Sequence, residues 1–135
     1  MSVLELRRDL VVLVCAVSAG IHAALVPEHF AESLGAGIGF AAATAALAAV
    51  AVALTLRPAS GVALAGAATV LAGLLAAYGL AITSGVPLLH PEPEAIHGLA
   101  VTTKAIEAAG LIAVAGLIVR GQKAAAPLAQ ANQHH

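Results

Sequence analysis

Residues 61–83 read GVALAGAATVLAGLLAAYGLAIT, an uncharged run of 23 residues. A helix needs about 20 apolar residues to cross the hydrocarbon core of a bilayer. Three further apolar runs lie at Leu10–Val26, Gly37–Leu56 and Ala95–Val119. In lipid, every backbone polar group must find a partner inside the protein, and these runs lack the alternating pattern of a barrel strand. The sequence therefore predicts four membrane-spanning helices.

The overall composition supports an integral membrane protein. Of the 135 residues, 61% are hydrophobic and 10% are charged, whereas about 25% are charged in a typical soluble domain. Six basic and seven acidic residues nearly cancel, which leaves no basic surface for nucleic acid. A single cysteine excludes a disulfide framework and a four-thiolate metal site. The lipid bilayer is thus the first partner that the sequence predicts.

The basic residues predict the orientation in the membrane. They flank the runs on one side: Arg7 and Arg8 precede the first run, Arg57 separates the second from the third, and Arg120 and Lys123 follow the fourth. The other two loops contain glutamates and no lysine or arginine. By the positive-inside rule, both termini are cytoplasmic in a multi-pass protein of the cell membrane. A cleaved signal peptide is the alternative for the first run, but its removal would leave three spans whose basic ends disagree.

These features predict an all-α, up-down-up-down bundle of four transmembrane helices over residues 1–123, followed by a disordered cytoplasmic tail at 124–135. In the first outer loop, Pro27 at the start and Gly35 at the end favour a separate short helix at the membrane surface. In the inner turn, Ser60 is a suitable cap for the third span.

A group of imidazole and carboxylate side chains falls on the predicted outer side. Its members are His22, His29, His90, His97 and Glu28. Such ligands suit zinc, copper or iron, so we expect a metal site there. The alternative cofactor is a haem held by His22 and His97, because both lie roughly 5–6 Å from the outer ends of their predicted spans. A further alternative is that these side chains only solvate the loops.

Two charged residues lie deeper in the last span. Lys104 and Glu107 are roughly 16 and 21 Å along a helix from Pro93, near the middle of the bilayer. Ionisable groups at that depth usually face the interior of the bundle, and a spacing of three allows these two to pair. The pair indicates a proton or ion path, a buried ligand pocket, or a purely structural contact.

Two stretches resemble small four-span membrane proteins of high-GC actinobacteria. They are Gly20–His29, which reads GIHAALVPEH, and the segment from Gly85-Val86-Pro87 through PEPE at 91–94 to TKAIE at 103–107. That group has no settled activity. The resemblance implies the four-helix layout and a shared role for five residues: His22, Glu28, His29, Lys104 and Glu107. Thr83-Ser84 departs from the group, whose members often carry an arginine before the Gly-x-Pro turn.

Three functions follow as hypotheses. The first is a membrane protein with a metal or haem at the outer site. The second is a small proton-coupled transporter, working alone or as a homo-oligomer, that uses Lys104 and Glu107. The third is a non-catalytic accessory subunit of a membrane complex. An enzyme is the least favoured class, because no nucleophile–base arrangement is visible.

Overall fold

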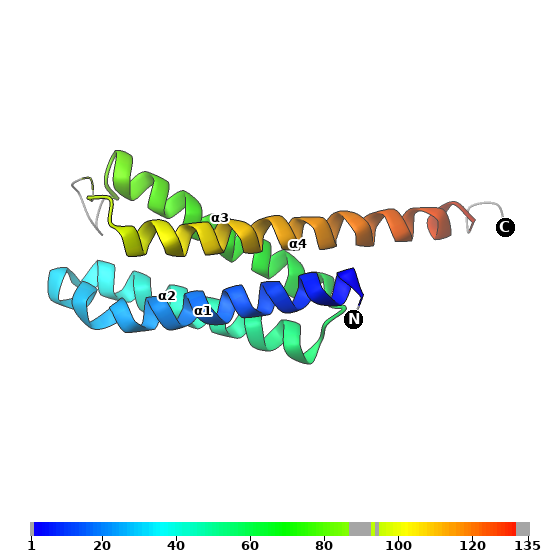
Figure 1. The fold of residues 1–135 in the computed structure, drawn as a ribbon, viewed down its shortest axis with the longest axis horizontal. Coiled ribbons are helices and arrows are strands. Elements are labelled where there is room, and N and C mark those ends of the chain that lie inside the picture. Colours follow the sequence, from blue (N-terminus) through cyan, green and yellow to red (C-terminus); the bar gives the residue numbers. More distant parts are fainter. Residues whose placement is uncertain (1, 87–92, 94, 132–135) are drawn as a thin grey trace.

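The computed structural model describes residues 2–86, 93 and 95–131, with only the backbone described from 123 onward. Four helices make up almost all of this part of the chain: α1 (Val3–Glu32), α2 (Leu34–Leu56), α3 (Gly61–Thr83) and α4 (Gly98–Ala131). Figure 1 shows α1 and α2 side by side, α4 running along them, and α3 crossing at a steeper angle. The all-helical class and the four helices are therefore as predicted.

Serine caps set the beginnings of the first three helices. Ser2 accepts a hydrogen bond from the Glu5 amide, and the Glu5 side chain accepts one from the Ser2 amide. Ser33 and Ser60 accept hydrogen bonds from the amides three residues later. A capping oxygen satisfies one of the free N–H groups at a helix start. The prediction that Ser60 caps the third helix is confirmed.

The structure shows no separate short helix between the first two spans in the described chain. α1 continues without a break through Pro27 to Glu32, and Ser33 alone separates it from α2. Proline inside a helix removes one hydrogen bond, and here the helix continues past that loss. The break comes instead at Ser33, whose extended backbone ends α1 while its hydroxyl caps α2. At the other end, α4 runs to Ala131, so helix extends eight residues past the predicted domain boundary at 123.

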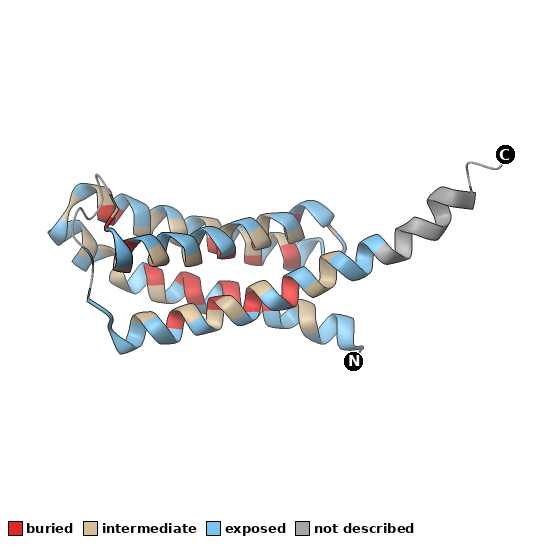
Figure 2. Ribbon diagram, turned by 90° about the horizontal axis from the view of Figure 1, so that it is seen from above, coloured by how far each residue is buried: buried red, intermediate tan, exposed pale blue. Residues whose placement is uncertain are grey.

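All four helices are long and apolar enough to cross a membrane. Their outer surfaces carry large apolar side chains, among them Val62 at 84% exposed and Ile112 at 74%. The buried set, by contrast, includes Ser18, His22, Thr103 and Glu107. Figure 2 shows the buried residues as short patches on helices whose other residues are exposed or intermediate. This arrangement suits lipid as the solvent, because apolar surface costs nothing there and polar groups are best kept inside.

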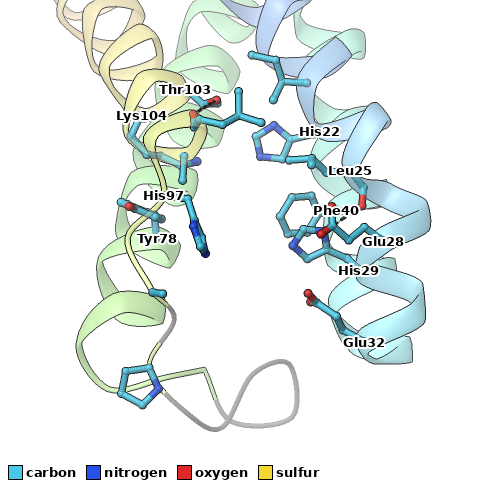
Figure 3. A pocket seen from close by; sticks show the side chains of 15 residues that line it. His22, Leu25, Glu28, His29, Glu32, Phe40, Tyr78, His97, Thr103 and Lys104 are labelled. Carbon is cyan, nitrogen blue, oxygen red and sulfur yellow. Dashed lines mark hydrogen bonds between the residues drawn. The ribbon is translucent and has the colours of Figure 1, made fainter.

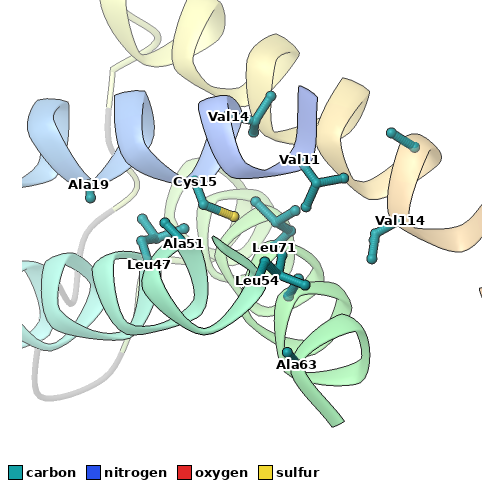
Figure 4. Close-up of a cluster of buried hydrophobic side chains, with 12 residues drawn as sticks. Val11, Val14, Cys15, Ala19, Leu47, Ala51, Leu54, Ala63, Leu71 and Val114 are labelled. Atoms are coloured by element: carbon teal, nitrogen blue, oxygen red, sulfur yellow. The ribbon is translucent and has the colours of Figure 1, made fainter. Parts of the chain in front are cut away.

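The buried apolar core lies around the middle of α1 and extends toward its N-terminus. Figure 4 shows Val11 and Cys15 of α1 against Leu47 and Leu54 of α2, with Leu71 of α3 close by. On α4, Gly110 lies so close to its neighbours that a Cβ there would come within 2.6 Å of Val14 Cγ1. The missing side chain at Gly110 therefore lets α1 and α4 approach closely in this part of the molecule.

Candidate functional site

Glu107 is fully buried at the contact between α4 and α1. Ser18 on α1 donates its hydroxyl to Glu107 Oε1 at 2.5 Å. Lys104, one turn away on α4, donates its ammonium to Glu107 Oε2 at 2.7 Å. Each carboxylate oxygen thus has its own donor, one of them charged. A buried carboxylate needs such partners because it has lost its hydration.

His22 adds an imidazole to this cluster. Its Nδ1 lies 2.9 Å from the backbone carbonyl of Ser18 and 4.0 Å from Glu107 Oε1. A carbonyl can only accept, so Nδ1 carries the hydrogen and donates it. In the neutral ring, Nε2 is then a free acceptor. We call Ser18, His22, Lys104 and Glu107 the buried polar cluster.

Beside the buried polar cluster, the helices separate around a cavity of about 590 Å³. We call it the α1/α4 cavity, because most of its lining comes from these two helices and from Pro93, Ala95 and His97. Figure 3 shows His22, Thr103 and Lys104 at one end, which we call the floor, and Glu32 at the other end, the rim. A volume of this size is within the usual range for small-molecule sites.

Aromatic rings line one side of the α1/α4 cavity. His29 stacks on Phe40 of α2 with ring centroids 3.5 Å apart, and His22 lies tilted against the same phenyl ring at 5.3 Å. His29 Nδ1 donates to the carbonyl of Leu25 at 2.9 Å, so its Nε2 is also an acceptor when the ring is neutral. The two imidazoles are thereby held in fixed orientations by backbone and aromatic contacts.

Lys104 connects the cluster to the cavity. Its side chain is 16% exposed and lines the α1/α4 cavity, whereas Glu107 is fully buried and is absent from the lining. The ammonium also lies 5.7 Å from the centre of the Tyr78 ring on α3. The Tyr78 hydroxyl is buried and has no hydrogen-bond partner within the described part of the chain. Lys104 is therefore the charged group that a molecule in the cavity can reach at the floor.

The structure brings together some of the residues proposed for a metal or haem and leaves others apart. His22, His29, His97 and Glu28 all line the α1/α4 cavity, and His90 lies outside the described residues. No three histidine, cysteine or acidic side chains in the described chain form a group that could hold a metal ion. His22 and His29 are two helical turns apart, roughly 10 Å. A metal site that includes His90 stays a prediction.

His22 and His97 both line the α1/α4 cavity, and a haem between them stays a prediction. His22 lies one turn from Ser18, which contacts Glu107, while His97 lies ten residues before Glu107, just ahead of the first residue of α4. Figure 3 shows His22 level with Lys104, and His97 nearer the rim on the opposite wall. The depth of His22 was estimated from Val26 as the end of the first span, whereas α1 continues to Glu32.

Three contributors to the site were not predicted from sequence as site residues. Ser18 lies four residues before His22, so the two share one face of a helix, but sequence does not say which other helix that face contacts. Phe40 and Tyr78 are two of only three aromatic residues in the chain. Their rarity was a signal that could have marked them as candidate site residues.

The four candidate membrane-spanning helices and the buried polar cluster define the chain as a small multi-pass membrane protein. No family model, curated protein or solved structure matches it.

Proposed function

We propose that the protein is a small proton-coupled transporter of the cell membrane, in which Glu107 binds the coupling proton. The observation that carries this proposal is the placement of Glu107: fully buried, paired with Lys104, and one side chain away from the α1/α4 cavity. Membrane-buried ionisable groups are usually functional, because they are costly to keep.

Charge balance gives the coupling. In the empty site, a carboxylate at Glu107 and an ammonium at Lys104 cancel. If a proton binds Glu107, Lys104 loses its counter-charge and needs an anion. If the proton leaves, the pair forms again. Since an unpaired buried charge is the costly state, proton binding and ligand binding at Lys104 are coupled.

Other titratable groups near Glu107 take part in this balance. On α1, His22 lies 4.0 Å from the carboxylate and Cys15 lies close enough to interact with its charge. On α4, Lys104 is its direct partner. From α3, Tyr78 faces Lys104 rather than Glu107. His22 lies in the cavity lining as well, so it offers a relay for protons between Glu107 and the cavity.

The proposed arrangement in the membrane is up-down-up-down with both termini cytoplasmic, which makes the cavity rim outward-facing. The distribution of basic residues supports this orientation. In a Cys15→Ala background, cysteine at Ser33 should react with a membrane-impermeant thiol reagent added to intact cells, and cysteine at Ser60 should not. The reverse pattern would contradict the proposed orientation.

The metal or haem site and the accessory-subunit role are the other hypotheses, and they make different predictions. A metal or haem protein purifies with stoichiometric metal or a Soret band. An accessory subunit has no reason to exchange a proton at Glu107. The helices also carry open small-residue positions such as Gly39 and Gly73, which suit contact with a second copy or a larger complex.

Infrared difference spectroscopy of the protein in liposomes tests the proposal. On lowering the pH, each carboxylate that takes up a proton gains a carbonyl band, and Glu107→Gln should lack the component that the wild type owes to Glu107. Glu5→Gln is the matched control, because Glu5 is exposed at the start of α1 and its replacement should leave the Glu107 component unchanged. A Glu107 component absent across the whole pH range in which the protein stays folded would overturn the proposal.

A further inference from the structure

We infer that the α1/α4 cavity binds a small zwitterion of the amino-acid type, with its carboxylate toward Lys104, its ammonium toward the rim and an apolar body between. This inference rests on the proposed function and names its substrate class. It is drawn from the charges and the chemistry along the length of the cavity.

At the floor, the accessible charge is positive. Lys104 lines the cavity, and only one of its three N–H donors is engaged by Glu107. Glu107 is fully buried and does not line the cavity. A ligand therefore meets the ammonium before the carboxylate, which selects an anionic group at this end. A ligand carboxylate matches the geometry and charge that Glu107 itself offers to Lys104.

Toward the rim, the lining groups are acceptors. His29 uses its Nδ1 hydrogen on the Leu25 carbonyl and leaves Nε2 as an acceptor. Glu28 lies beside His29 on α1 and Glu32 lies one turn further toward the rim, so two carboxylates line this part of the cavity. A ligand ammonium would donate to such groups, and a ligand with only negative charge would be repelled by them. The opposite signs at floor and rim thus favour a molecule that carries both charges.

Between the two ends, the wall is apolar and aromatic. Leu25, Phe40, Tyr78 and Leu99 contribute to it. A side pocket of about 190 Å³ adjoins this part and shares His22, His29, Phe40, Tyr78 and Lys104 with the larger cavity. Apolar wall and side pocket suit an amino acid with an apolar side chain, and the volume exceeds what one such molecule needs.

The charge balance at the floor requires the anionic end of such a molecule. Its carboxylate replaces Glu107 as the partner of Lys104, while its ammonium is balanced by the carboxylates nearer the rim. Glu107 can then take up a proton without leaving Lys104 unpaired. Ligand and proton therefore enter together. A cationic ligand would instead have to bind beside the Lys104 ammonium, which lies between the cavity and Glu107.

Three forms of leucine that differ in charge test the inference with the full-length protein in detergent. Leucine carries both charges, N-acetyl-leucine only the negative one, and leucine methyl ester only the positive one. In an equilibrium assay with radiolabelled leucine, we expect the other two to compete on the order of tenfold more weakly, because each loses a charge-assisted contact. A methyl ester that competes as well as leucine, or no leucine binding at all, would overturn the inference.

Two variants sharpen this test. Lys104→Met/Glu107→Gln removes both charges of the pair, so it should fold yet lose leucine binding. Glu28→Gln/Glu32→Gln should reduce the preference for leucine over N-acetyl-leucine. Ile112→Met is the control, since Ile112 lies on the exposed face of α4 away from the cavity lining. Full leucine binding by the Lys104→Met/Glu107→Gln protein would contradict the placement of the ligand.

The coupling separates this inference from the proposed function. Adding leucine to the wild type at fixed pH should increase the infrared band of protonated Glu107, because linkage is reciprocal. Leucine methyl ester should not increase it. If Glu107 takes up a proton on acidification but no leucine form binds or shifts it, the zwitterion inference fails while the proposed function stands. If Glu107 never takes up a proton, the proposed function itself fails.

Discussion

The two halves of the α1–α4 interface differ sharply. From Gly110 onward along α4, the helix packs closely against α1, and Val14 and Leu71 fill the space beside Gly110. From Lys104 back to His97, the chain is separated from α1 by the α1/α4 cavity. The change coincides with side-chain type, because small and branched apolar residues give way to Lys104, His22 and His97. Close packing in one half of the interface holds the bundle together. The other half is not closely packed and has space to bind a ligand.

The largest expected effect comes from breaking the charged pair at the boundary between the halves. Glu107→Ala leaves Lys104 without its counter-charge, so folding stability should fall by about 3–5 kcal/mol. Lys104→Met should cost less, because a lone Glu107 can take up a proton and become neutral. The double variant Lys104→Met/Glu107→Gln should recover most of the loss. The midpoint of thermal denaturation in detergent measures all three.

This series has a clear contrary outcome. Single variants as stable as the wild type would mean that the pair is not desolvated. The Lys104–Glu107 pair would then not mark the boundary between the two halves of the interface. A double variant no more stable than the worse single variant would mean that Ser18 or His22, rather than the charge balance, decides the stability.

Adding one methyl group to the closely packed half should have a smaller effect. A Cβ at Gly110 would meet Val14 Cγ1 at 2.6 Å and Leu71 Cδ1 at 3.2 Å, so Gly110→Ala should lose about 1–3 kcal/mol. Gly116 on the same helix is the control. There, the Cβ would meet only the Arg7 guanidinium, the far end of a flexible side chain that can move away. Equal losses at Gly110 and Gly116 would argue against close packing at Gly110.

The smallest effect on stability is expected in the cavity half. Ala100 lines the cavity, so Ala100→Leu should change stability by less than about 0.5 kcal/mol while it fills space that a ligand needs. Ala113, also on α4, belongs to the buried core, so Ala113→Leu should cost about 1–3 kcal/mol. Denaturation midpoints and leucine binding should therefore respond in opposite ways to the two variants. Similar losses of stability at both positions would indicate that no cavity separates the helices near Ala100.

The helices could be predicted from sequence because lipid imposes a minimum apolar length on each span. The predicted run Gly61–Thr83 has the same bounds as α3, and Gly37–Leu56 differs from α2 only at its start. The end of the first span was missed because Pro27 resembles a helix start, yet α1 continues through it. From sequence alone, a proline can indicate either the start of a new helix or a position inside a longer one. Tertiary contacts decide whether the helix tolerates the one hydrogen bond that proline removes.

The site was less accessible to sequence reasoning. The spacing of Lys104 and Glu107 follows from the period of one helix, and their contact of 2.7 Å lies within α4. Ser18 is 89 residues from Glu107, and nothing in the local pattern of either segment says that α1 and α4 are neighbours. Depths for His22 and His97 could be estimated only from the predicted end of each residue's own span. Contacts between helices depend on the order of packing, which side-chain periodicity alone does not give.

The most direct test of the cavity is the accessibility of its wall. In a Cys15→Ala background, Ala100→Cys should react with a charged, membrane-impermeant thiol reagent added from outside, and leucine should slow that reaction. Val114→Cys, in the closely packed half and fully buried, should not react. An unreactive cysteine at position 100, in a protein whose Ser33→Cys variant is labelled from outside, would contradict an outward-facing cavity between α1 and α4.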